Sequence, residues 1–249
     1  MGSGSRTTAT ATVTTAPTWS WTNPKLGEQE REQIRLALCS TRGRYLAVRA
    51  SQLSGVPKST VYYWAREGLI VPDHADLHPM YWSYRDLVLL RLYAWLRTKN
   101  MAPGNASTMI GSVRHRLDLG KLDEAHVRSD GRVFLHGDSA VDALSGQQLF
   151  SELVPWVDHF DLFVPVDNAR WQGPNLLRPS RFTAISPWVL GGDRCVAGTR
   201  VPTSSLHSLA EDRGLDSREI LHLYPFLKPA AVTDALDLER RLQGLALAA

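Results

Sequence analysis

Cysteine is scarce in this sequence, and long hydrophobic runs are missing from it. The 249 residues contain two cysteines, Cys39 and Cys195, far apart in the chain. A disulfide framework or a thiolate metal site needs clustered cysteines, so we expect neither and favour a reducing compartment. The most apolar stretch, residues 87–96, is interrupted by Arg91 and is shorter than the roughly 18 residues of a membrane span. We therefore expect a soluble, cytoplasmic chain without a membrane partner.

The first 27 residues have few large apolar side chains and lack the Leu-rich core of a secretory signal. Thr, Ala, Ser and Gly dominate them, so burial could not offset the entropy cost of ordering them. Arg6 stands where an N-myristoylation motif requires Ser or Thr. We expect residues 1–27 to be a disordered tail that neither exports nor anchors the protein.

Acidic residues are few in the first half of the chain and in excess in the second. Residues 1–120 hold 15 basic and 8 acidic side chains, whereas residues 121–249 hold 13 and 17. The formal net charge of +3 therefore conceals +7 in the first half and −4 in the second. Opposite charges indicate that the two halves bind different partners.

Helical spacing and turn residues predict a mainly α-helical fold with small β-elements. In the first half, the expected helices cover residues 28–39, 47–53, 58–67, 84–99 and 105–117. Short strands at 69–71 and 80–82 predict a wing-like hairpin, and Ser83 with Asp86 fits a capping box. The pattern then changes to alternating apolar residues around 127–135, which predicts a β-hairpin.

These patterns divide the chain into five segments. We expect a disordered tail at 1–27, a winged helix-turn-helix domain at 28–120, a small β-element at 121–164, a linker at 165–181 and a small helical domain at 182–242. The last domain is either toxin-binding or a second helix-turn-helix-like module. The linker prediction depends on the many Pro, Gly and Arg residues of 165–181 and on their lack of periodicity.

A helix-turn-helix is the clearest motif. Ser51 is small where two helices would cross, Gly55 permits a positive φ in the turn, and Val56, Val61 and Trp64 can anchor the second helix. The outward face of that helix would then carry Lys58, Ser59, Tyr62, Tyr63 and Arg66. A helical hairpin with merely solvated charges is the alternative, but the basic first half favours DNA.

Residues 45–99, with LSGVPKSTVYYWAREGLI followed by YWSYRDLVLLRLYAWLR, resemble the winged helix-turn-helix domain of MerR-type regulators. The resemblance implies a homodimer on two half-sites, with wing contacts to the DNA backbone around residues 74–78. It also implies groove contacts from Lys58, Ser59, Thr60, Tyr62, Tyr63 and Arg66. The long carboxy-terminal coiled-coil helix and the metal-binding cysteines of the family are missing, so metal sensing is not expected.

The run SPWVLGGDRCVAGTRVP at residues 186–202 lacks the spacing and the lysine of a phosphate-binding loop. It favours a tight hairpin before a helix capped by Thr203 or Ser204, with three helices at 203–213, 217–223 and 229–242. The segment up to residue 242, with its Tyr-Pro pair at 224–225, is similar to a small helical family whose members accompany PIN-like ribonuclease toxins as antitoxins. The chain thus resembles a VapB-type antitoxin with a MerR-like amino terminus.

The sequence gives no reason to assign a catalytic residue, a cofactor or a metal site. The lone acidic cluster at 158–161 is typical of a solvated turn, and His126 and His136 are expected to make ordinary hydrogen bonds. Cys195 lies beside Val196 without a base in sequence reach, which argues against a nucleophile. We do not expect an enzyme.

We expect an antitoxin that binds operator DNA as a homodimer, neutralises a PIN-like ribonuclease toxin and represses its own operon. No sequence rule identifies the toxin-binding face, although the net −4 of residues 121–249 is compatible with a basic toxin cleft. Two alternatives stay open: a stand-alone transcription regulator whose β-element or linker binds a small molecule, and an adaptor whose helical modules both contact proteins.

Overall fold

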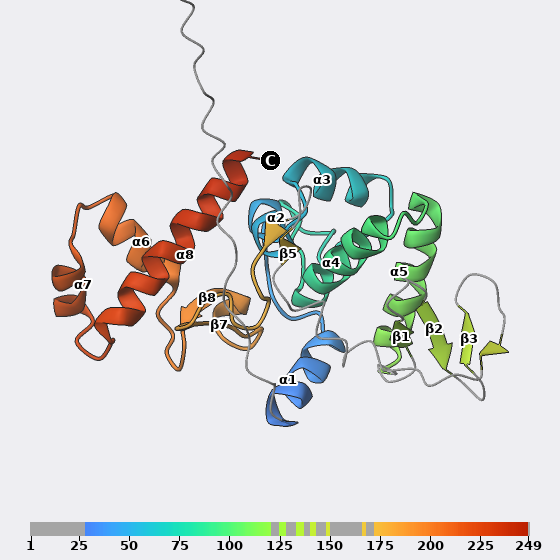
Figure 1. Ribbon diagram of the computed structural model, residues 1–249, viewed down its shortest axis with the longest axis horizontal. Helices are drawn as coiled ribbons and strands as arrows, with labels where there is room; N and C mark the ends of the chain where they lie inside the picture. Colours follow the sequence, from blue (N-terminus) through green and yellow to red (C-terminus); the bar gives the residue numbers. More distant parts are fainter. Residues whose placement is uncertain are drawn as a thin grey trace, which may run out of the picture.

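The computed structural model describes residues 28–120 and 172–248, together with short strands at 125–127, 133–136, 140–142, 148–149 and 166–167. The fold is mainly helical with small antiparallel sheets, as the sequence predicted. Figure 1 shows the helices of the first half at the centre of the molecule and those of the second half at one end.

Five helices form the amino-terminal half: α1 (Glu28–Leu38), α2 (Ala47–Ser54), α3 (Lys58–Arg66), α4 (Tyr84–Thr98) and α5 (Pro103–Asp118). The predicted helices are confirmed to within two residues at each end. The capping box of α4 is also confirmed. Ser83 Oγ accepts a hydrogen bond from the Asp86 N–H at 3.1 Å, and the Asp86 carboxylate accepts one from the Ser83 N–H at 2.8 Å.

α4 is the central helix of the amino-terminal core. Its apolar side chains are completely shielded from solvent: Leu87, Val88, Leu89, Leu90, Leu92 and Leu96. α1, α2 and α5 all pack against it. Because burying one such side chain contributes about 1.5–3 kcal/mol, α4 contributes strongly to the stability of this half.

A four-stranded antiparallel meander follows, made of β1 (Ala125–Val127), β2 (Val133–His136), β3 (Ala140–Asp142) and β4 (Gln148–Leu149). Val127 of β1 stands opposite Val133 of β2, which confirms the predicted hairpin. β2 contacts α5, and Figure 1 shows the meander at the end of the molecule opposite the carboxy-terminal helices.

Part of the predicted linker is packed into the amino-terminal core. After β5 (Val166–Asp167) pairs with β6 (Gln172–Gly173), Leu176 is fully buried in that core. The Leu176 carbonyl accepts a hydrogen bond from the Tyr84 hydroxyl at 3.1 Å. Gly173 lies so close to the end of α2 that an added Cβ would stand 2.8 Å from the Gly55 nitrogen. Residues 173–176 are therefore a fixed part of the core and not a spacer.

The carboxy-terminal module consists of a hairpin and three helices. β7 (Thr183–Ile185) and β8 (Arg194–Val196) pair antiparallel around the 3₁₀ helix η3 (Leu190–Gly192). The helices are α6 (Thr203–Glu211), α7 (Ser217–Leu223) and α8 (Pro229–Ala248), which confirms the predicted order. Leu206, Ile220 and Val232 are completely buried where these helices meet.

The predicted cap of α6 is wrong. Pro202 occupies the position before the helix and makes no side-chain cap hydrogen bond. Thr203 is the first helical residue, and its hydroxyl donates a hydrogen bond to the Glu239 carboxylate on α8 instead. A buried charged acceptor is a stronger partner for this hydroxyl than a helix terminus.

Hydrogen bonds join the two halves on both sides of α2. The Tyr45 hydroxyl, just before α2, donates to the Gly192 carbonyl at 2.7 Å. Gly192 has a φ of 90°, and an added Cβ would stand 1.9 Å from the Tyr45 hydroxyl oxygen, so glycine is required there. The Gln52 side-chain amide donates to the Leu242 carbonyl of α8 at 3.3 Å. α2 is thus held between the amino-terminal core and α8 (Figure 1).

Candidate nucleic-acid interface

A tight turn connects α2 to α3. Gly55 ends α2 with a φ of 79°, and its N–H donates to the Ser51 carbonyl at 2.9 Å. Val56 is fully buried, and Pro57 precedes the first residue of α3. A side chain at Gly55 would be strained in this left-handed conformation. The turn therefore sets the angle between the two helices, as the sequence predicted.

Val61 and Trp64 hold α3 on the core. Val61 is completely buried, Trp64 is 5% exposed, and the Trp64 ring lies against the Tyr93 ring of α4 with centroids 4.1 Å apart. Because residues three apart share one face of a helix, these anchors leave the opposite face of α3 in solvent.

The solvent face of α3 carries most of the predicted DNA-binding residues. Lys58, Ser59, Tyr62, Tyr63 and Arg66 are exposed, whereas Thr60 is half-buried. The Tyr62 ring packs edge-on against Trp82 with centroids 6.0 Å apart, and the Arg66 guanidinium lies 5.9 Å from the Tyr63 ring. These ring contacts support two hydroxyl groups and a guanidinium on one accessible surface.

The wing is narrower than the sequence predicted. The described residues 69–71 form no strand, and Ile70 among them is buried in the core. A single antiparallel bridge between His74 and Tyr81 closes the hairpin. His74 Nε2 also lies 2.9 Å from the Thr41 carbonyl, which ties the wing to the segment before α2.

A buried ion network fixes the base of the wing. The Arg85 guanidinium of α4 donates to both carboxylate oxygens of Asp73, at 2.6 and 2.7 Å. Arg114 of α5 binds the same carboxylate, and Arg85 also donates to Asp118 at 2.7 Å. The position of the wing relative to α3 therefore depends on α4 and α5.

Asp86 is a fully buried carboxylate beside this network. It accepts hydrogen bonds from the N–H groups of Ser83 and Asp73, both at 2.8 Å, and Arg114 lies 3.3 Å away. Burial and then the charge of Asp73 raise the pKa of Asp86 to about 6, which Arg114 only partly opposes. Folding therefore raises the pH at which Asp86 loses its proton, although the group is still ionised at neutral pH.

Replacing Asp86 by asparagine should change how stability depends on pH. The pKa of an unfolded aspartate is about 3.9, so between about pH 4 and 6 the folded protein holds a proton that the unfolded chain has released. The contribution of Asp86 to the free energy of unfolding therefore falls as pH rises, and asparagine removes this loss. We expect the stability of the Asp86→Asn variant relative to the wild type to rise by about 1–3 kcal/mol from pH 4.5 to 7 in urea denaturation. A difference that is constant with pH would contradict this.

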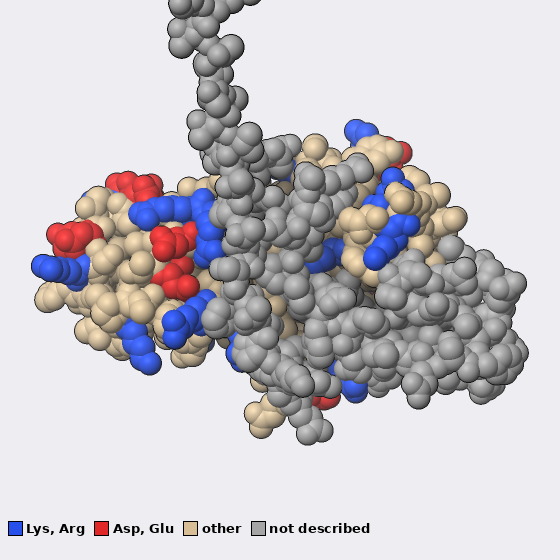
Figure 2. Space-filling model, in the orientation of Figure 1, with Lys and Arg blue, Asp and Glu red and all other residues tan. Residues whose placement is uncertain are grey.

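Basic side chains predominate on the visible part of the helix-turn-helix region (Figure 2). Figure 2 shows mainly Lys and Arg among the charged side chains over the visible part of α3–α5, whereas acidic and basic side chains are mixed over α6–α8. Phosphates attract a surface of the first kind, because neutralising them releases counterions. The electrostatics therefore agree with the exposed face of α3 as a nucleic-acid contact.

The Cys195 thiol lies in surroundings that oppose its ionisation. Burial raises the pKa of the Cys195 thiol to about 11, the opposite of what a nucleophile needs. Within the described ranges, no three His, Cys, Asp or Glu side chains gather where they could hold a metal ion. The acidic cluster at 158–161 and the side chains of His126 and His136 lie outside the described residues. In the described part of the chain, no helix has the length and apolarity to cross a bilayer.

Arg91 supports the interface in a way that the sequence analysis missed. Arg91 is 1% exposed, and its guanidinium donates hydrogen bonds to the carbonyls of Leu53 and Ser54, at the end of α2, and of Pro174. It therefore fixes the helix-turn-helix turn to α4 and to the following segment. The sequence signal for this role is a single charge inside the apolar run 87–96.

Two family matches agree with this geometry. Residues 47–112 match the family described as MerR HTH family regulatory protein, and residues 184–237 match the family described as Protein of unknown function (DUF433). No curated protein and no solved structure matches the chain. The first match confirms the MerR-type helix-turn-helix domain and supports a DNA-binding regulator. The resemblance to a VapB-type antitoxin stays a prediction.

Proposed function

We propose that this protein is an antitoxin that binds operator DNA through α3, neutralises a PIN-like ribonuclease toxin and represses its own operon. The DNA-binding part rests on the solvent face of α3. Val61 and Trp64 are buried on the opposite face and so orient this face toward solvent. Helix-turn-helix proteins place the corresponding helix in the major groove and bind two half-sites as dimers, so we propose a homodimer. Such regulators act by binding, and we propose no catalytic step.

The dimensions of α3 suit a major groove. Lys58 and Arg66 are the first and last residues of α3, so they lie about 12 Å apart along its axis. A helix with its side chains is about 10–12 Å in diameter, so α3 fits a major groove about 12 Å wide. Lys58 and Arg66 at its two ends can then contact phosphates along the groove, while Tyr62 and Tyr63 offer hydroxyls to base edges.

Alanine at Lys58 or Arg66 tests the DNA contact. Each substitution should weaken binding to the DNA upstream of the gene by about 1–3 kcal/mol if the contact is to a base edge, in gel-shift titrations at two salt concentrations. Lys58→Ala should also reduce the salt dependence if it removes a phosphate contact. Lys228→Ala, an exposed cation between α7 and α8, is the control of equal charge and should bind as the wild type does. Unchanged affinity in both α3 variants would move the DNA-binding face elsewhere, and no salt-sensitive shift in the wild type would exclude DNA binding.

The antitoxin part is supported by the resemblance of residues 182–242 and by the acidic excess of the second half. Its experiment is co-expression with the product of the neighbouring gene. We expect the two proteins to purify together and the ribonuclease activity of the partner to disappear. Separate elution, or an active ribonuclease in the complex, would contradict the antitoxin function without affecting DNA binding.

A stand-alone regulator with a small-molecule ligand is the second candidate. The observation that favours it is a cavity of about 300 Å³ between α1, the start of α4 and the β7–β8 hairpin. An adaptor that only contacts proteins has no comparable support, because the exposed face of α3 and the charge around it suit DNA.

A further inference from the structure

One carboxylate oxygen holds both ends of the wing, which we define as residues 73–83 with their single antiparallel bridge. Asp86, in the first turn of α4, accepts hydrogen bonds at Oδ2 from the N–H groups of Asp73 and Ser83, both at 2.8 Å. Asp73 begins the wing and Ser83 ends it. The Ser83 hydroxyl also donates to the Asp73 carboxylate at 2.5 Å. The base of the wing is therefore closed around Asp86.

The wing supports the solvent face of α3 through Trp82. Trp82 precedes Ser83 and is completely buried, and its ring lies edge-on against the Tyr62 ring with centroids 6.0 Å apart. Tyr62 is 44% exposed and belongs to the face of α3 that we propose to contact DNA. Trp82 and Tyr45 also exchange two backbone hydrogen bonds of 2.9 Å just before α2. A shift of the wing at Ser83 would therefore alter the packing that supports Tyr62.

The ion network around Asp86 contains three carboxylates and two guanidinium groups: Asp73, Asp86 and Asp118 with Arg85 and Arg114. An excess of one negative charge favours the uptake of one proton. Burial acts to raise the pKa of Asp73, but hydrogen bonds from Arg85 hold it below its usual value, and the Asp118 side chain is 50% exposed. Asp86 is completely buried, and its pKa of about 6 makes it the carboxylate that takes up this proton. The proton adds to Oδ1, which accepts no hydrogen bond from the described residues and lies 3.3 Å from Arg114.

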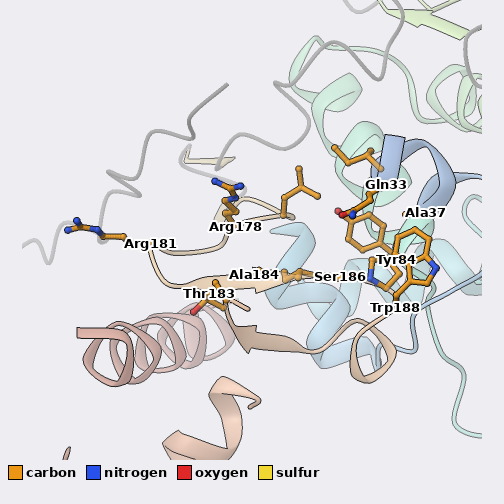
Figure 3. A pocket seen from close by; sticks show the side chains of 14 residues that line it. Gln33, Ala37, Tyr84, Arg178, Arg181, Thr183, Ala184, Ser186 and Trp188 are labelled. Carbon is orange, nitrogen blue, oxygen red and sulfur yellow. The ribbon is translucent and has the colours of Figure 1, made fainter. Parts of the chain in front are cut away.

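Asp86 is directed toward the wing and away from the cavity beside α1. Tyr84, two residues earlier in α4, lines that cavity, as Figure 3 shows. Residues two apart in a helix do not share a face, so Asp86 lies on a different side of α4. The arginines that line the cavity, Arg178 and Arg181, therefore do not face Asp86.

We propose that Asp86 is a positioning residue through which pH controls operator binding. This role rests on the proposed function, because it concerns the DNA contact of α3. The ionised carboxylate accepts two charge-assisted hydrogen bonds and attracts Arg114, which fixes both ends of the wing and, through Trp82, the position of Tyr62. The protonated group is a weaker acceptor and has no charge to attract Arg114, so it holds the wing less tightly. Affinity for DNA therefore falls as Asp86 takes up its proton.

DNA titrations of the full-length protein at constant ionic strength test this role, by fluorescence anisotropy of the duplex upstream of the gene. Asp86→Asn is neutral at every pH and so represents the protonated state. We expect the wild type to bind roughly fivefold or more tightly than Asp86→Asn at about pH 7.5, and the ratio of affinities to fall toward one at about pH 5. The ratio removes the effect of the wing histidines, His74 and His78, because both proteins contain them.

The stability of Asp86→Asn separates positioning from folding. Relative to the wild type, this variant should become more stable as pH rises, because asparagine has no proton to lose. Its affinity for DNA relative to the wild type should become weaker over the same range. A variant that bound poorly because it was partly unfolded would instead show its largest defect at low pH.

Asp118→Asn is the matched control. Asp118 belongs to the same network, but its carboxylate binds Arg85 at 2.7 Å and receives neither of the N–H groups at the ends of the wing. The ratio of wild-type affinity to Asp118→Asn affinity should therefore stay constant with pH.

Arg114→Gln is a second variant that keeps Asp86 able to ionise. It removes the cation that favours the ionised carboxylate, so the pH at which DNA binding is half lost should be higher than in the wild type. A ratio of wild-type to Asp86→Asn affinity that does not change with pH would overturn the proposal, and so would an unchanged midpoint in folded Arg114→Gln. If Lys58→Ala still weakened binding at about pH 7.5 in that case, the proposed contact of α3 would stand without the pH control. Absence of any wild-type binding would overturn both.

Discussion

Replacing Glu239 by alanine is expected to lower the free energy of unfolding by about 3–5 kcal/mol. The Glu239 carboxylate on α8 receives hydrogen bonds from the Arg194 guanidinium at 2.7, 2.8 and 2.9 Å and one from the Thr203 hydroxyl. Arg194 and Glu239 are 1% and 4% exposed. Removing one partner leaves an uncompensated charge in the core of the carboxy-terminal module, and this is the reason for the large loss.

The protonation state of Glu239 agrees with this role. Burial acts to raise its pKa, but the Arg194 charge and the hydrogen bond from Thr203 hold the pKa of Glu239 below its usual value. The carboxylate is therefore ionised in the folded protein at neutral pH. Its contribution to stability is present above the unfolded pKa and is lost as pH falls through the lower folded value.

Glu211 provides the matched control for Glu239. It also pairs with an arginine of α8, Arg240, at 3.2 Å, but these side chains are 49% and 55% exposed. Exposed pairs contribute less than about 1 kcal/mol, so Glu211→Ala should change urea denaturation little. Combining Glu239→Leu with Arg194→Met should recover part of the loss, because it removes both buried charges. Equal destabilisation by the two alanine variants would mean that Arg194 is not buried in solution.

Local features of the fold could be predicted from the sequence. The cap of α4 needs Ser83 and Asp86 three residues apart, and the solvent face of α3 follows from Val61 and Trp64 at the same spacing. Gly55 marks the turn because few other residues adopt its φ. These features depend on residues within one helical turn, so one sequence is sufficient to find them.

Features that depend on distant partners could not be predicted. Thr203 has the chemistry of a helix cap, but Glu239, 36 residues later, captures its hydroxyl. Residues 165–181 have the composition of a linker, yet Leu176 completes a core formed about 90 residues earlier in the chain. The apolar run at 69–71 is compatible with a strand, but in the structure this segment is not a strand and its Ile70 side chain packs into the core. The cavity likewise joins α1 to residues that follow it by roughly 150 positions.

Replacing Arg91 by methionine is expected to lower the free energy of unfolding by about 2–4 kcal/mol and to weaken DNA binding. Methionine fills the space of the aliphatic chain but leaves the buried carbonyls of Leu53 and Pro174 without this donor. Each buried acceptor that loses its partner costs about 1–3 kcal/mol. Burial lowers the pKa of Arg91 to about 9, and relief of that burial cost offsets part of the loss.

Arg97 on the same helix is the control for Arg91. It is only partly buried and donates to one nearby carbonyl, that of Met101, so Arg97→Met should cost less than about 1.5 kcal/mol and leave DNA binding unchanged. Urea denaturation gives the stability of both variants, and gel shifts under conditions where both are folded give their affinity. If Arg91→Met bound DNA as tightly as Arg97→Met, the hydrogen bonds between Arg91 and the end of α2 would contribute to stability but not to DNA binding. Weaker DNA binding by Arg91→Met would show that α3 binds DNA only when the hydrogen bonds from Arg91 fix the turn before it.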